Sequence, residues 1–481
     1  MAWTIIMKTH SSDYLPINFE LTDDIKKAFD IIEYTDRSVF ITGRAGTGKS
    51  TLIEYFRINT KKEVVYLAPT GVTALSIRGK TVHSFFKFPS EVITYPLIKG
   101  NTYSGNKISL FNNIDTIVID EISMARADLI DGIDYILKRF RRRNGDVFGG
   151  VQMIFIGDVY QLPPFINKLQ TANITLKNGE VLTQTSLFDY FQDKYKGPYF
   201  FDSPAFKKGN FIYFEMETVF RQRKDNDFLN ILNAIRDNEI DDKLLSKLNT
   251  RYFQEIGELE SNTIILCTTN NCAYEINKQK MEALRTKKIV YKATISGSFE
   301  SEIKESNYPV PEYLELKEKA QVMMVKNDKD GRWVNGTVGI IDKLTDSSVF
   351  VKINRHVYPV PIETWQNIEY IYDLQEETLA TKILGEYKQY PIKLAWASTI
   401  HRSQGKTFDK VLIDFSIKPF AHGQTYVALS RCRTLNGIIL KQLIDKKDIS
   451  VKYDNRVKYF VVEMKKNNQY FDIDYNNDVL F

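Results

Sequence analysis

The sequence predicts an α/β protein with two parallel-sheet cores and a small β-rich insertion in the second core. A strand, a glycine loop and a helical pattern occupy residues 39–56, and the apolar strand 63–68 follows them. This order is a βαβ unit, which requires a parallel sheet. Strand patterns within residues 263–270 and 410–415 indicate the second core. Between them, residues 290–390 alternate apolar and polar positions with Gly and Asn-Asp turns, as short strands of a small barrel do.

Length and composition narrow the class of protein. A chain of 481 residues is too long for one core and predicts about three domains. The net charge of +5 permits an anionic partner without demonstrating one. Cys267, Cys272 and Cys432 match neither a disulfide framework nor a CxxC metal motif, which indicates a reducing compartment. Residues 1–14 lack a targeting pattern and no apolar run reaches ~18 residues, so we expect a cytoplasmic protein with no membrane partner, nucleoid-associated in a bacterium.

Residues 43–50 match the phosphate-loop pattern G-x-x-x-x-G-K-[ST] in full. Glycines let the backbone wrap an anion closely, the amides of the loop and the helix start point at phosphates, and Lys49 adds a positive charge. Ser50 is the expected Mg²⁺ ligand. The alternative is a glycine-rich turn that fits the pattern by chance. The residues expected to hold the nucleotide are Gly43, Ala45, Gly46, Thr47, Gly48, Lys49, Ser50 and Thr51.

Acidic residues end the next apolar strand, residues 114–121. At the carboxyl end of a parallel strand, Asp120 can reach a metal ion and Glu121 can orient and deprotonate an attacking water. A strand end that merely becomes exposed and polar is the alternative. The following strand ends in G-D-V-Y-Q-L-P-P, which places Gln161 opposite a γ-phosphate, although an ordinary loop residue has the same appearance.

Two further stretches carry weaker signals. Residues 81–105 mix aromatic residues with Gly and Ser and predict an inserted hairpin or loop rather than a core layer. Residues 138–143, with the sequence K-R-F-R-R-R, end a predicted helix. Such a run is most often a solvated helix end, and a nucleic-acid contact is the alternative.

The order of the motifs resembles that of superfamily 1 DNA helicases, most closely the Pif-type branch (superfamily 1B) with its RecD relatives. The first half contains G-x-x-G-x-G-K-S-T, A-P-T-G, D-E-I-S-M and G-D-x-x-Q-L-P-P, and the branch's signature element resembles residues 128–152. The second half continues the likeness at residues 217–222, 399–407 and 426–433. The resemblance covers residues 22–433, which is most of the chain.

This resemblance implies two RecA-like motor domains, and we expect boundaries at 1–191 for the first, 192–289 with 391–481 for the second, and 290–390 for an SH3-like barrel. A wedge insertion is expected at about 80–105. The implied activity is ATP-dependent translocation on single-stranded DNA, with 5′→3′ polarity, and unwinding of duplex or G-quadruplex DNA in replication, repair, recombination or telomere maintenance. ATP and Mg²⁺ are the implied cofactors. The expected partners are single-stranded DNA, duplex junctions and G-quadruplexes, bound by a monomer or a DNA-induced dimer.

The resemblance also implies residue roles. Arg221 and Arg431 should reach the nucleotide from the second core as arginine fingers, beside Lys49, Asp120, Glu121 and Gln161, and Gly405 should lie at the nucleotide. The expected DNA-binding residues are Pro69, Thr70, Gly71, His83, Phe85, Thr268, Asn270, Ser398, Thr399 and His401. Phe85 could equally be a core residue. The family commonly has a Gln that selects adenine where this chain has Ile25, so selectivity among nucleotides stays open.

Three classes of function compete at this point. A DNA helicase requires two cores with arginines facing one nucleotide. A P-loop kinase or small-molecule ATPase would use the same loop but has no need of the second core. A non-catalytic nucleic-acid-binding module conflicts with the presence of Lys49, Asp120 and Glu121 together. Unwinding of RNA or RNA–DNA hybrids is an alternative within the helicase class.

Overall fold

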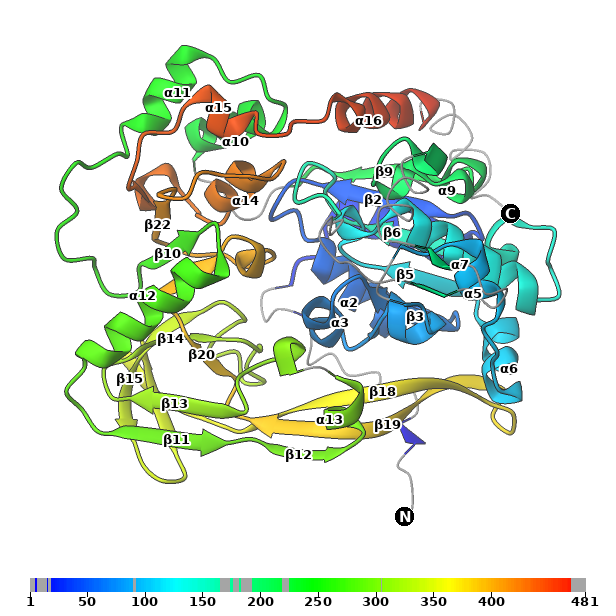
Figure 1. The fold of residues 1–481 in the computed structure, drawn as a ribbon, viewed down its shortest axis with the longest axis horizontal. Helices are drawn as coiled ribbons and strands as arrows, with labels where there is room; N and C mark the ends of the chain where they lie inside the picture. Colours follow the sequence, from blue (N-terminus) through cyan, green and yellow to red (C-terminus); the bar gives the residue numbers. More distant parts are fainter. Residues whose placement is uncertain are drawn as a thin grey trace.

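The computed structural model describes residues 19–89, 92–164, 193–218, 225–303 and 305–468, with short separate stretches at Ile5–Ile6, Leu15, Ile174–Thr175 and Val181–Leu182. Two α/β cores lie side by side, the first at the right of Figure 1 and the second at its upper left, with a β-rich region below the second. The architecture is mixed α/β, as the sequence predicts.

The first core is a six-stranded parallel sheet with the order β4-β3-β5-β6-β2-β9. Alternate residues of its strands face opposite sides, so Val39 and Ile41 pack with one set of helices and Phe40 with the other. Both faces are therefore covered, as a parallel sheet requires. The strands are β2 (Val39–Gly43), β3 (Val64–Ala68), β4 (Lys80–Thr81), β5 (Thr116–Ile119), β6 (Gln152–Ile156) and β9 (Ile212–Met216). The helices are α1 (Asp23–Tyr34), α2 (Lys49–Asn59), α3 (Gly71–Ser76), α4 (Val82–Phe86), α5 (Tyr95–Lys99), α6 (Gly105–Asn113), α7 (Ala127–Phe140) and α9 (Pro204–Lys208).

The first core extends beyond the predicted boundary at residue 191. Strand β9 pairs in parallel with β2, from Val39 opposite Ile212 to Gly43 opposite Met216. Because β2 leads into the glycine loop, β9 supports the strand that carries the nucleotide motif. The prediction that the second core begins at residue 192 is therefore wrong: no local signal distinguishes a strand that joins the first sheet from one that starts a second.

The predicted hairpin or loop at residues 81–105 is also corrected. In its described residues this stretch contains the short helices α4 and α5, and Phe85, Phe86 and Phe88 are buried in the main hydrophobic core. The rings of Phe86 and Phe111 stack at 5.9 Å between centroids. The aromatic side chains fill the space between the sheet and α6, so this stretch is part of a core layer.

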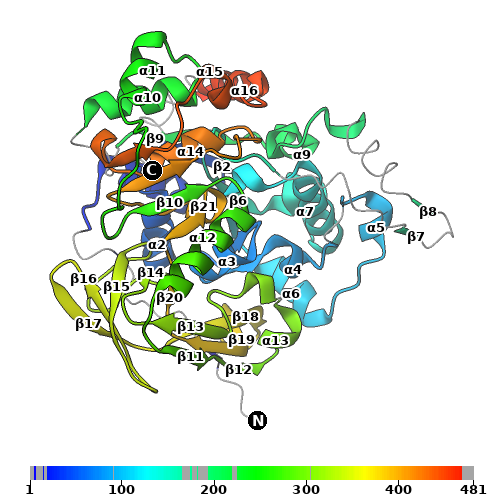
Figure 2. The same ribbon diagram turned by 60° about the vertical axis from the view of Figure 1, so that its left-hand side comes forward.

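The second core contains a four-stranded parallel sheet with the order β21-β10-β22-β23. In Figure 2, α12 lies beside β10 and β21. The Asn277 side chain of this helix accepts a bond from the Ala397 N–H at 2.9 Å and donates to the Ala397 carbonyl at 2.8 Å, which fixes the helix to the edge strand. The strands are β10 (Ile264–Cys267), β21 (Ala397–Thr399), β22 (Val411–Asp414) and β23 (Ile438–Leu440), and the helices are α10 (Asn226–Arg236), α11 (Asp242–Asn249), α12 (Asn270–Ala283), α14 (Gln424–Ser430) and α15 (Lys446–Ile449).

The region between β10 and β21 is β-rich, as predicted. A five-stranded antiparallel sheet has the order β17-β16-β15-β14-β20. In another sheet, β19 pairs with β18 over its full length and also with β12 and with β1, which comes from the start of the chain. Closure of these strands into an SH3-like barrel stays a prediction. The strands are β1 (Ile5–Ile6), β11 (Lys288–Lys292), β12 (Thr294–Gly297), β13 (Tyr313–Lys317), β14 (Gln321–Met324), β15 (Val338–Leu344), β16 (Val349–Ile353), β17 (His356–Val360), β18 (Glu363–Asp373), β19 (Thr378–Gln389) and β20 (Ile392–Leu394), with α13 (Phe299–Glu302).

The β18–β19 ribbon extends beneath the first core in Figure 1 and contacts it. The Tyr66 N–H of β3 donates to the Tyr370 hydroxyl at 3.2 Å. The Glu63 carboxylate accepts bonds from the Leu379 N–H at 2.7 Å and from the Thr378 hydroxyl at 3.0 Å. These contacts join the inserted region to the edge of the first sheet.

The last described helix, α16 (Asn455–Asn468), leaves the second core and packs on the first. The ring of Phe460 stacks on Phe201 at 4.3 Å and approaches Phe40 of β2 at 5.7 Å between centroids. The interpretation of residues 391–481 as part of the second core is thus wrong for this helix. Its apolar residues have a partner that only the folded chain brings near.

The remaining described elements are short. They are the hairpin of β7 (Ile174–Thr175) with β8 (Val181–Leu182) and the 3-10 helices η2 (Ile122–Met124), η3 (Val147–Gly150), η4 (Phe200–Asp202), η5 (Glu305–Asn307), η6 (His401–Ser403) and η7 (Leu435–Gly437). Among the helices of the described residues, none combines the length and the apolar character needed to cross a bilayer.

Candidate functional site

The glycine loop connects the carboxyl end of β2 to the start of α2. Gly46 and Gly48 have φ angles of 84° and 88°, a left-handed conformation that favours glycine, and Gly48 is the N-cap of α2 without a capping side chain. The first amides of the helix are therefore free to bind an anion. The Lys49 ammonium donates to the carbonyls of Gly43 at 2.7 Å and Arg44 at 3.0 Å, and burial lowers its pKa. The loop has the form of a phosphate site.

Asp120 and Glu121 follow β5 at the same edge of the sheet. The Asp120 carboxylate accepts the Glu121 N–H at 2.8 Å, and Glu121 has a positive φ of 50°, which turns the chain sharply after the strand. Burial raises the pKa of Asp120 to about 6. Burial, and then the charge of Asp120, raise the pKa of Glu121 to about 7, while Lys49 and Arg431 act in the opposite direction. The two carboxyl groups and the Lys49 ammonium thus share one buried electrostatic environment.

The donor atoms at this edge fit a hard cation such as Mg²⁺. The Asp120 carboxylate is 9% exposed, and the Ser50 hydroxyl lies in the first, exposed turn of α2. Carboxylate and hydroxyl oxygens are the ligands that Mg²⁺ prefers, together with phosphate oxygens and water. Ser50 and Asp120 are therefore the residues suited to hold the ion.

Asp158 connects the two cores and was not singled out by sequence reasoning. It is 1% exposed and accepts bonds from the Gln161 amide at 3.2 Å and from the Tyr426 hydroxyl of α14 at 3.3 Å. The guanidinium of Arg236 from α10 lies 3.6 Å away. The Tyr426 oxygen also accepts the Ala45 N–H of the glycine loop at 3.5 Å. Asp158 and Tyr426 lie inside sequence motifs that could have indicated a role at the site. Arg236 lies in an amphipathic helix, and no sequence pattern distinguishes it as a site residue.

Gln404 makes a second bridge between the cores. Its side-chain amide donates to Glu121 Oε2 at 3.2 Å and to Gln161 Oε1 at 3.0 Å. Gly423, also in the second core, approaches the first so closely that a Cβ there would lie 2.5 Å from the Tyr160 carbonyl. The predicted residues Glu121 and Gln161 are thus brought together, and Gly405 follows Gln404 in the second core.

The structure describes only one of the two predicted arginine fingers, Arg431. Arg221 lies outside the described residues. Arg431 is 1% exposed and donates to the Val427 carbonyl at 2.9 Å and to the Ser430 hydroxyl at 2.8 Å, so its hydrogen bonds stay within the second core. Its charge is still near enough to lower the pKa of Glu121. The finger role of Arg431 stays a prediction, because in this structure its side chain does not reach the glycine loop.

Most of the predicted DNA-binding residues follow strand ends of both sheets. Thr70 caps α3, and its hydroxyl accepts the Thr73 N–H at 3.3 Å. The Thr268 hydroxyl donates to the Ile417 carbonyl at 3.0 Å, and the Thr399 hydroxyl accepts the Arg402 N–H at 3.2 Å, so both already bond within the protein. The residues at least partly exposed are Pro69, Thr70, Gly71, His83, Asn270, Ser398 and His401.

Phe85 is a core residue in this structure, which corrects its assignment to the DNA-binding face. Its side chain is 1% exposed and packs edge-on against Phe86 and Tyr370, at 4.9 Å and 5.9 Å between centroids. The Lys107 ammonium lies 3.5 Å from its ring centroid. A ring enclosed on these sides has no free face for a base.

A group of three cations flanks Ser398, Thr399 and His401 in the sequence and was missed by sequence reasoning. It consists of Lys393 in β20, Arg402 in η6 and Lys406. Burial, then repulsion from Lys393 and Arg402, lowers the pKa of Lys406 to about 7, and burial with Arg402 lowers that of Lys393 to about 8. Clustered positive charge of this kind attracts an anion.

Several residues of the basic run at 138–143 make contacts within the chain. Lys138 pairs with Asp134 at 2.9 Å, and Arg143 pairs with Asp146 at 3.4 Å. The Arg141 guanidinium donates to the carbonyls of Gly149 at 2.8 Å and Ile114 at 3.0 Å. These contacts hold the end of α7, and so they supply a structural reason for the run.

Two parallel-sheet cores that meet at one phosphate loop define a P-loop motor of the RecA-like type. The description "PIF1-like helicase" belongs to the family model that matches residues 20–192. The Pif1 helicase of Bdellovibrio bacteriovorus is 30% identical over 454 residues, which cover 93% of each chain. The chain belongs to the PIF1-like helicase family, whose curated members found here are named ATP-dependent DNA helicases.

Human PIF1 is 30% identical over 434 residues, which cover 89% of this chain and 62% of the human protein. This chain therefore spans about three fifths of that relative's length. Among solved structures, Bacteroides sp Pif1 in complex with ADP-AlF4 is 32% identical with a TM-score of 0.82, and 94% of this chain and 99% of that chain are covered. Bacteroides Pif1 bound to ssDNA has the same identity and coverage and a TM-score of 0.64.

Proposed function

We propose that this protein is an ATP-dependent DNA helicase that moves 5′→3′ on single-stranded DNA and unwinds duplexes or G-quadruplexes. The observation that carries the proposal is the pair of hydrogen bonds that the side-chain amide of Gln404, a second-core residue, donates to Glu121 and Gln161 of the first core. A residue that spans the cleft beside the catalytic carboxylate makes the closure of the cores sensitive to what the glycine loop holds. ATP turnover is then linked to relative motion of the cores.

Each residue at the cleft has a role in this proposal. Lys49 and the loop amides bind the phosphates, Ser50 and Asp120 hold Mg²⁺, and Glu121 accepts a proton from the attacking water. The ion supplies charge neutralisation at the phosphates when it is bound. Gln161 senses the terminal phosphate. Arg431 and Arg221 neutralise charge on the transferring phosphoryl group after the cores close, a role worth ~10³–10⁵ in rate for arginine fingers.

The DNA strand lies across both cores, at the strand ends that carry Thr70, Asn270 and Ser398. Lys393, Arg402 and Lys406 stand next to this surface and supply cations for phosphates. Solved Pif1 structures include Bacteroides Pif1 bound to ssDNA and a structure that describes DNA unwinding at forked dsDNA by two coordinating Pif1 helicases. That likeness supports single-stranded DNA and forks as ligands here, with a second copy joining on DNA. Roles in replication, repair, recombination and telomere maintenance follow from the same activity.

Strand separation on matched substrates tests the proposal. One duplex is given a 5′ tail, a 3′ tail or no tail, and each is incubated with the protein, ATP and Mg²⁺. We expect unwinding of the 5′-tailed duplex only. Unwinding of the 3′-tailed duplex alone contradicts the direction. An ATPase that DNA does not stimulate favours the small-molecule ATPase, and a preference for 5′-tailed RNA–DNA hybrids or RNA duplexes favours those substrates. A tailed G-quadruplex in the same assay tests that substrate.

Nucleotide choice needs its own measurement. Ile25, where the family resemblance implies a Gln, is 1% exposed and packs into the apolar cluster beneath α1. A buried aliphatic side chain offers no hydrogen bond to a base, so we expect weak discrimination between ATP and GTP. Steady-state turnover of both nucleotides on saturating single-stranded DNA measures it, and a strong preference for ATP would mean that another residue reads the base.

A further inference from the structure

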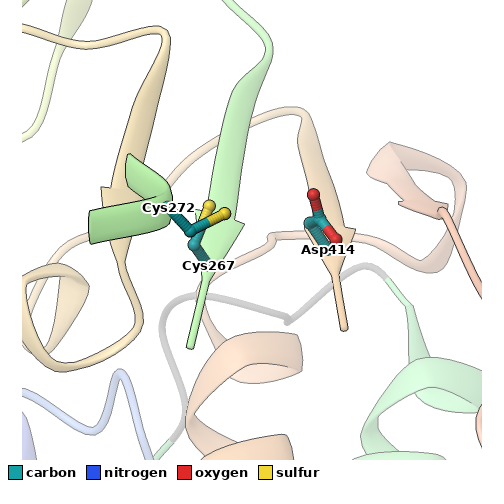
Figure 3. Close-up of side chains that lie close together, drawn as sticks. All are labelled: Cys267, Cys272 and Asp414. Carbon is teal, nitrogen blue, oxygen red and sulfur yellow. The ribbon is translucent and has the colours of Figure 1, made fainter. Parts of the chain in front are cut away.

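Two cysteines and an aspartate meet at the carboxyl edge of the second sheet (Figure 3). Cys267 ends β10 and Asp414 ends β22, and the two residues are paired neighbours in the parallel ladder. Side chains paired in this way emerge on the same face of a sheet. Cys272 reaches that face from the first turn of α12, which begins after the loop 268–269. The sheet register and the helix start therefore bring together residues that lie up to 147 positions apart, from Cys267 to Asp414.

The three side chains have the chemistry of a metal site. One ligand atom from each, the two Sγ atoms and a carboxylate oxygen, lie within 4.8 Å of one another. Two thiolates with one carboxylate suit a borderline-soft divalent cation such as Zn²⁺, whose bonds are about 2.3 Å to sulfur and about 2.0–2.2 Å to oxygen. Cys267 and Asp414 are buried and Cys272, at the start of α12, is half-buried.

Asp414 is already oriented for such a role. Its Oδ2 accepts from the Lys441 ammonium at 2.8 Å, and its Oδ1 accepts the Ser416 N–H at 2.9 Å. A carboxylate has about four lone-pair positions, so these two bonds leave room for a metal bond. Outer hydrogen bonds that fix a ligating carboxylate are a common part of metal sites. Cys272 lies in the first turn of α12, where the helix macrodipole favours the thiolate form.

We propose that Cys267, Cys272 and Asp414 bind a Zn²⁺-class divalent cation, with a fourth coordination position left for water. Binding converts both thiols to thiolates and releases their two protons to solvent, and no oxidation occurs. The alternative is that the cysteines only pack in an apolar cluster, because Cys267 lies among Ile265, Ala273 and Leu412. Packing accounts for Cys267, and the Lys441 ammonium compensates the charge of Asp414, but neither requires two sulfur atoms and a carboxylate oxygen to lie within 4.8 Å of one another.

The site has a consequence for the neighbouring loop. Residues 268–271 lie between the two cysteine ligands and comprise the loop 268–269 and the first two residues of α12; Thr268 and Asn270 are expected to contact the DNA strand. A bound cation would fix both ends of this short segment. This part of the inference rests on the proposed function: metal loading should strengthen binding of single-stranded DNA by preorganising the loop.

Cobalt titration of the reduced, tag-free full chain tests the metal site, with Co²⁺ as the probe and Zn²⁺ as the competitor. We expect one Co²⁺ per chain, a thiolate-to-cobalt charge-transfer band, and loss of the band on adding Zn²⁺. Cys272→Ser should abolish the band, and Asp414→Asn should keep a sulfur band with weaker affinity. Cys432→Ser is the matched control, since Cys432 is buried elsewhere in the same core, and it should leave the band unchanged.

Three results of these experiments would overturn the metal site. A wild-type chain without the band, or a band that survives in Cys272→Ser, overturns the site. Loss of two titratable thiols under air without bound metal would show a disulfide between the cysteines instead, and also overturns it. ATP turnover without DNA is expected to be unchanged in Cys272→Ser, which shows that the variant folds.

Anisotropy titrations of labelled single-stranded DNA, with zinc-loaded and zinc-free protein, test the coupling. Tighter binding by the loaded wild-type chain, absent in Cys272→Ser, supports the preorganised loop. Equal affinities contradict the coupling but leave the cobalt result standing. A chain that binds cobalt and no DNA at all would refute the proposed helicase function and not the metal site.

Discussion

Lys49 shows how a single side chain is prepared for its ligand. Its ammonium is bonded to two loop carbonyls, and burial lowers its pKa, so a charged group is kept in a poorly solvated place. Phosphate oxygens at the loop would add negative charge to that of Asp158, Glu121 and Asp120, which already favour the charged ammonium. The nearby carboxyl groups of Asp120 and Glu121 have raised pKa values for the same reason, burial.

Lys49→Ala should lower DNA-stimulated ATP turnover by at least ~10²-fold, because the cation that stabilises the transferring phosphoryl is removed. Steady-state phosphate release measures it. Lys61→Ala, at an exposed lysine just beyond α2, is the control and should turn over ATP normally. Normal turnover by the Lys49 variant would refute the assignment of the loop.

If the proposed strand contacts Lys393 and Lys406, DNA binding should depend on pH. Because their pKa values are lowered to about 8 and about 7, both lose their positive charge as the pH rises through this range. We therefore expect the affinity for single-stranded DNA to fall from pH 6.5 to pH 8.5, and the slope of log affinity against log salt to shrink by ~0.7 per lost phosphate contact.

Lys406→Arg should reduce this pH dependence, because arginine stays charged throughout the range. Lys410→Arg, at a lysine on the surface of the same core that pairs with Glu260, should leave the profile as in the wild type. Anisotropy titrations at each pH give the affinities. A flat profile for the wild type would show that these lysines do not contact the strand.

At the scale of elements, α16 depends on a partner from another part of the chain. Its Phe460 is 8% exposed and packs on Phe201 and Phe40, whereas its neighbour Tyr459 is 70% exposed. The helix thus ties the end of the second core to the strand that precedes the glycine loop. An isolated helix of this length would be marginal in water, so tertiary packing supplies most of its stability.

Phe460→Ala should destabilise the protein by ~3–5 kcal/mol, as is usual for truncating a buried phenylalanine. The midpoint of urea unfolding, followed by fluorescence and circular dichroism, measures the change. Tyr459→Ala, on the exposed face of the same helix, should stay within about 0.5 kcal/mol. Equal effects of the two substitutions would mean that α16 does not pack on the first core.

For the whole molecule, the central contact is the buried pair of Arg236 and Asp158. The guanidinium is 7% exposed, lies 3.6 Å from Asp158 and 3.7 Å from Glu215, and stands 4.2 Å from the Tyr160 ring centroid. All three partners belong to the first core and Arg236 to the second. Removing one member of a buried pair leaves the other charge without compensation.

Arg236→Gln should therefore cost ~3–5 kcal/mol and should weaken the coupling of the two cores. We expect a lower melting temperature and a smaller stimulation of ATP turnover by DNA. Arg433→Gln removes an exposed ion pair with Asp409, whose side chains are 57% and 83% exposed, and should have little effect. Equal melting temperatures for the two variants would contradict a structural role of the buried pair.

Site residues could be predicted from the sequence where they lie in short motifs, and could not be predicted where their role depends on contacts between the cores. Lys49, Asp120, Glu121 and Gln161 lie in short motifs at strand ends, and the structure gathers them at one edge of the sheet. Arg236 and Gln404 bridge the cores, but each contact depends on where the second core sits. Phe85 was ambiguous because a buried ring and a stacking ring have the same sequence pattern.

The sequence by itself determined the glycine loop, the acidic strand end, the two α/β cores and membership of a helicase family, since these depend on short spacings and local periodicity. Only the tertiary structure decided that β9 completes the first sheet, that α16 returns to it, and that Cys267, Cys272 and Asp414 meet. Each of these depends on contacts between residues far apart in the chain, whose geometry is set by the packing of the whole molecule.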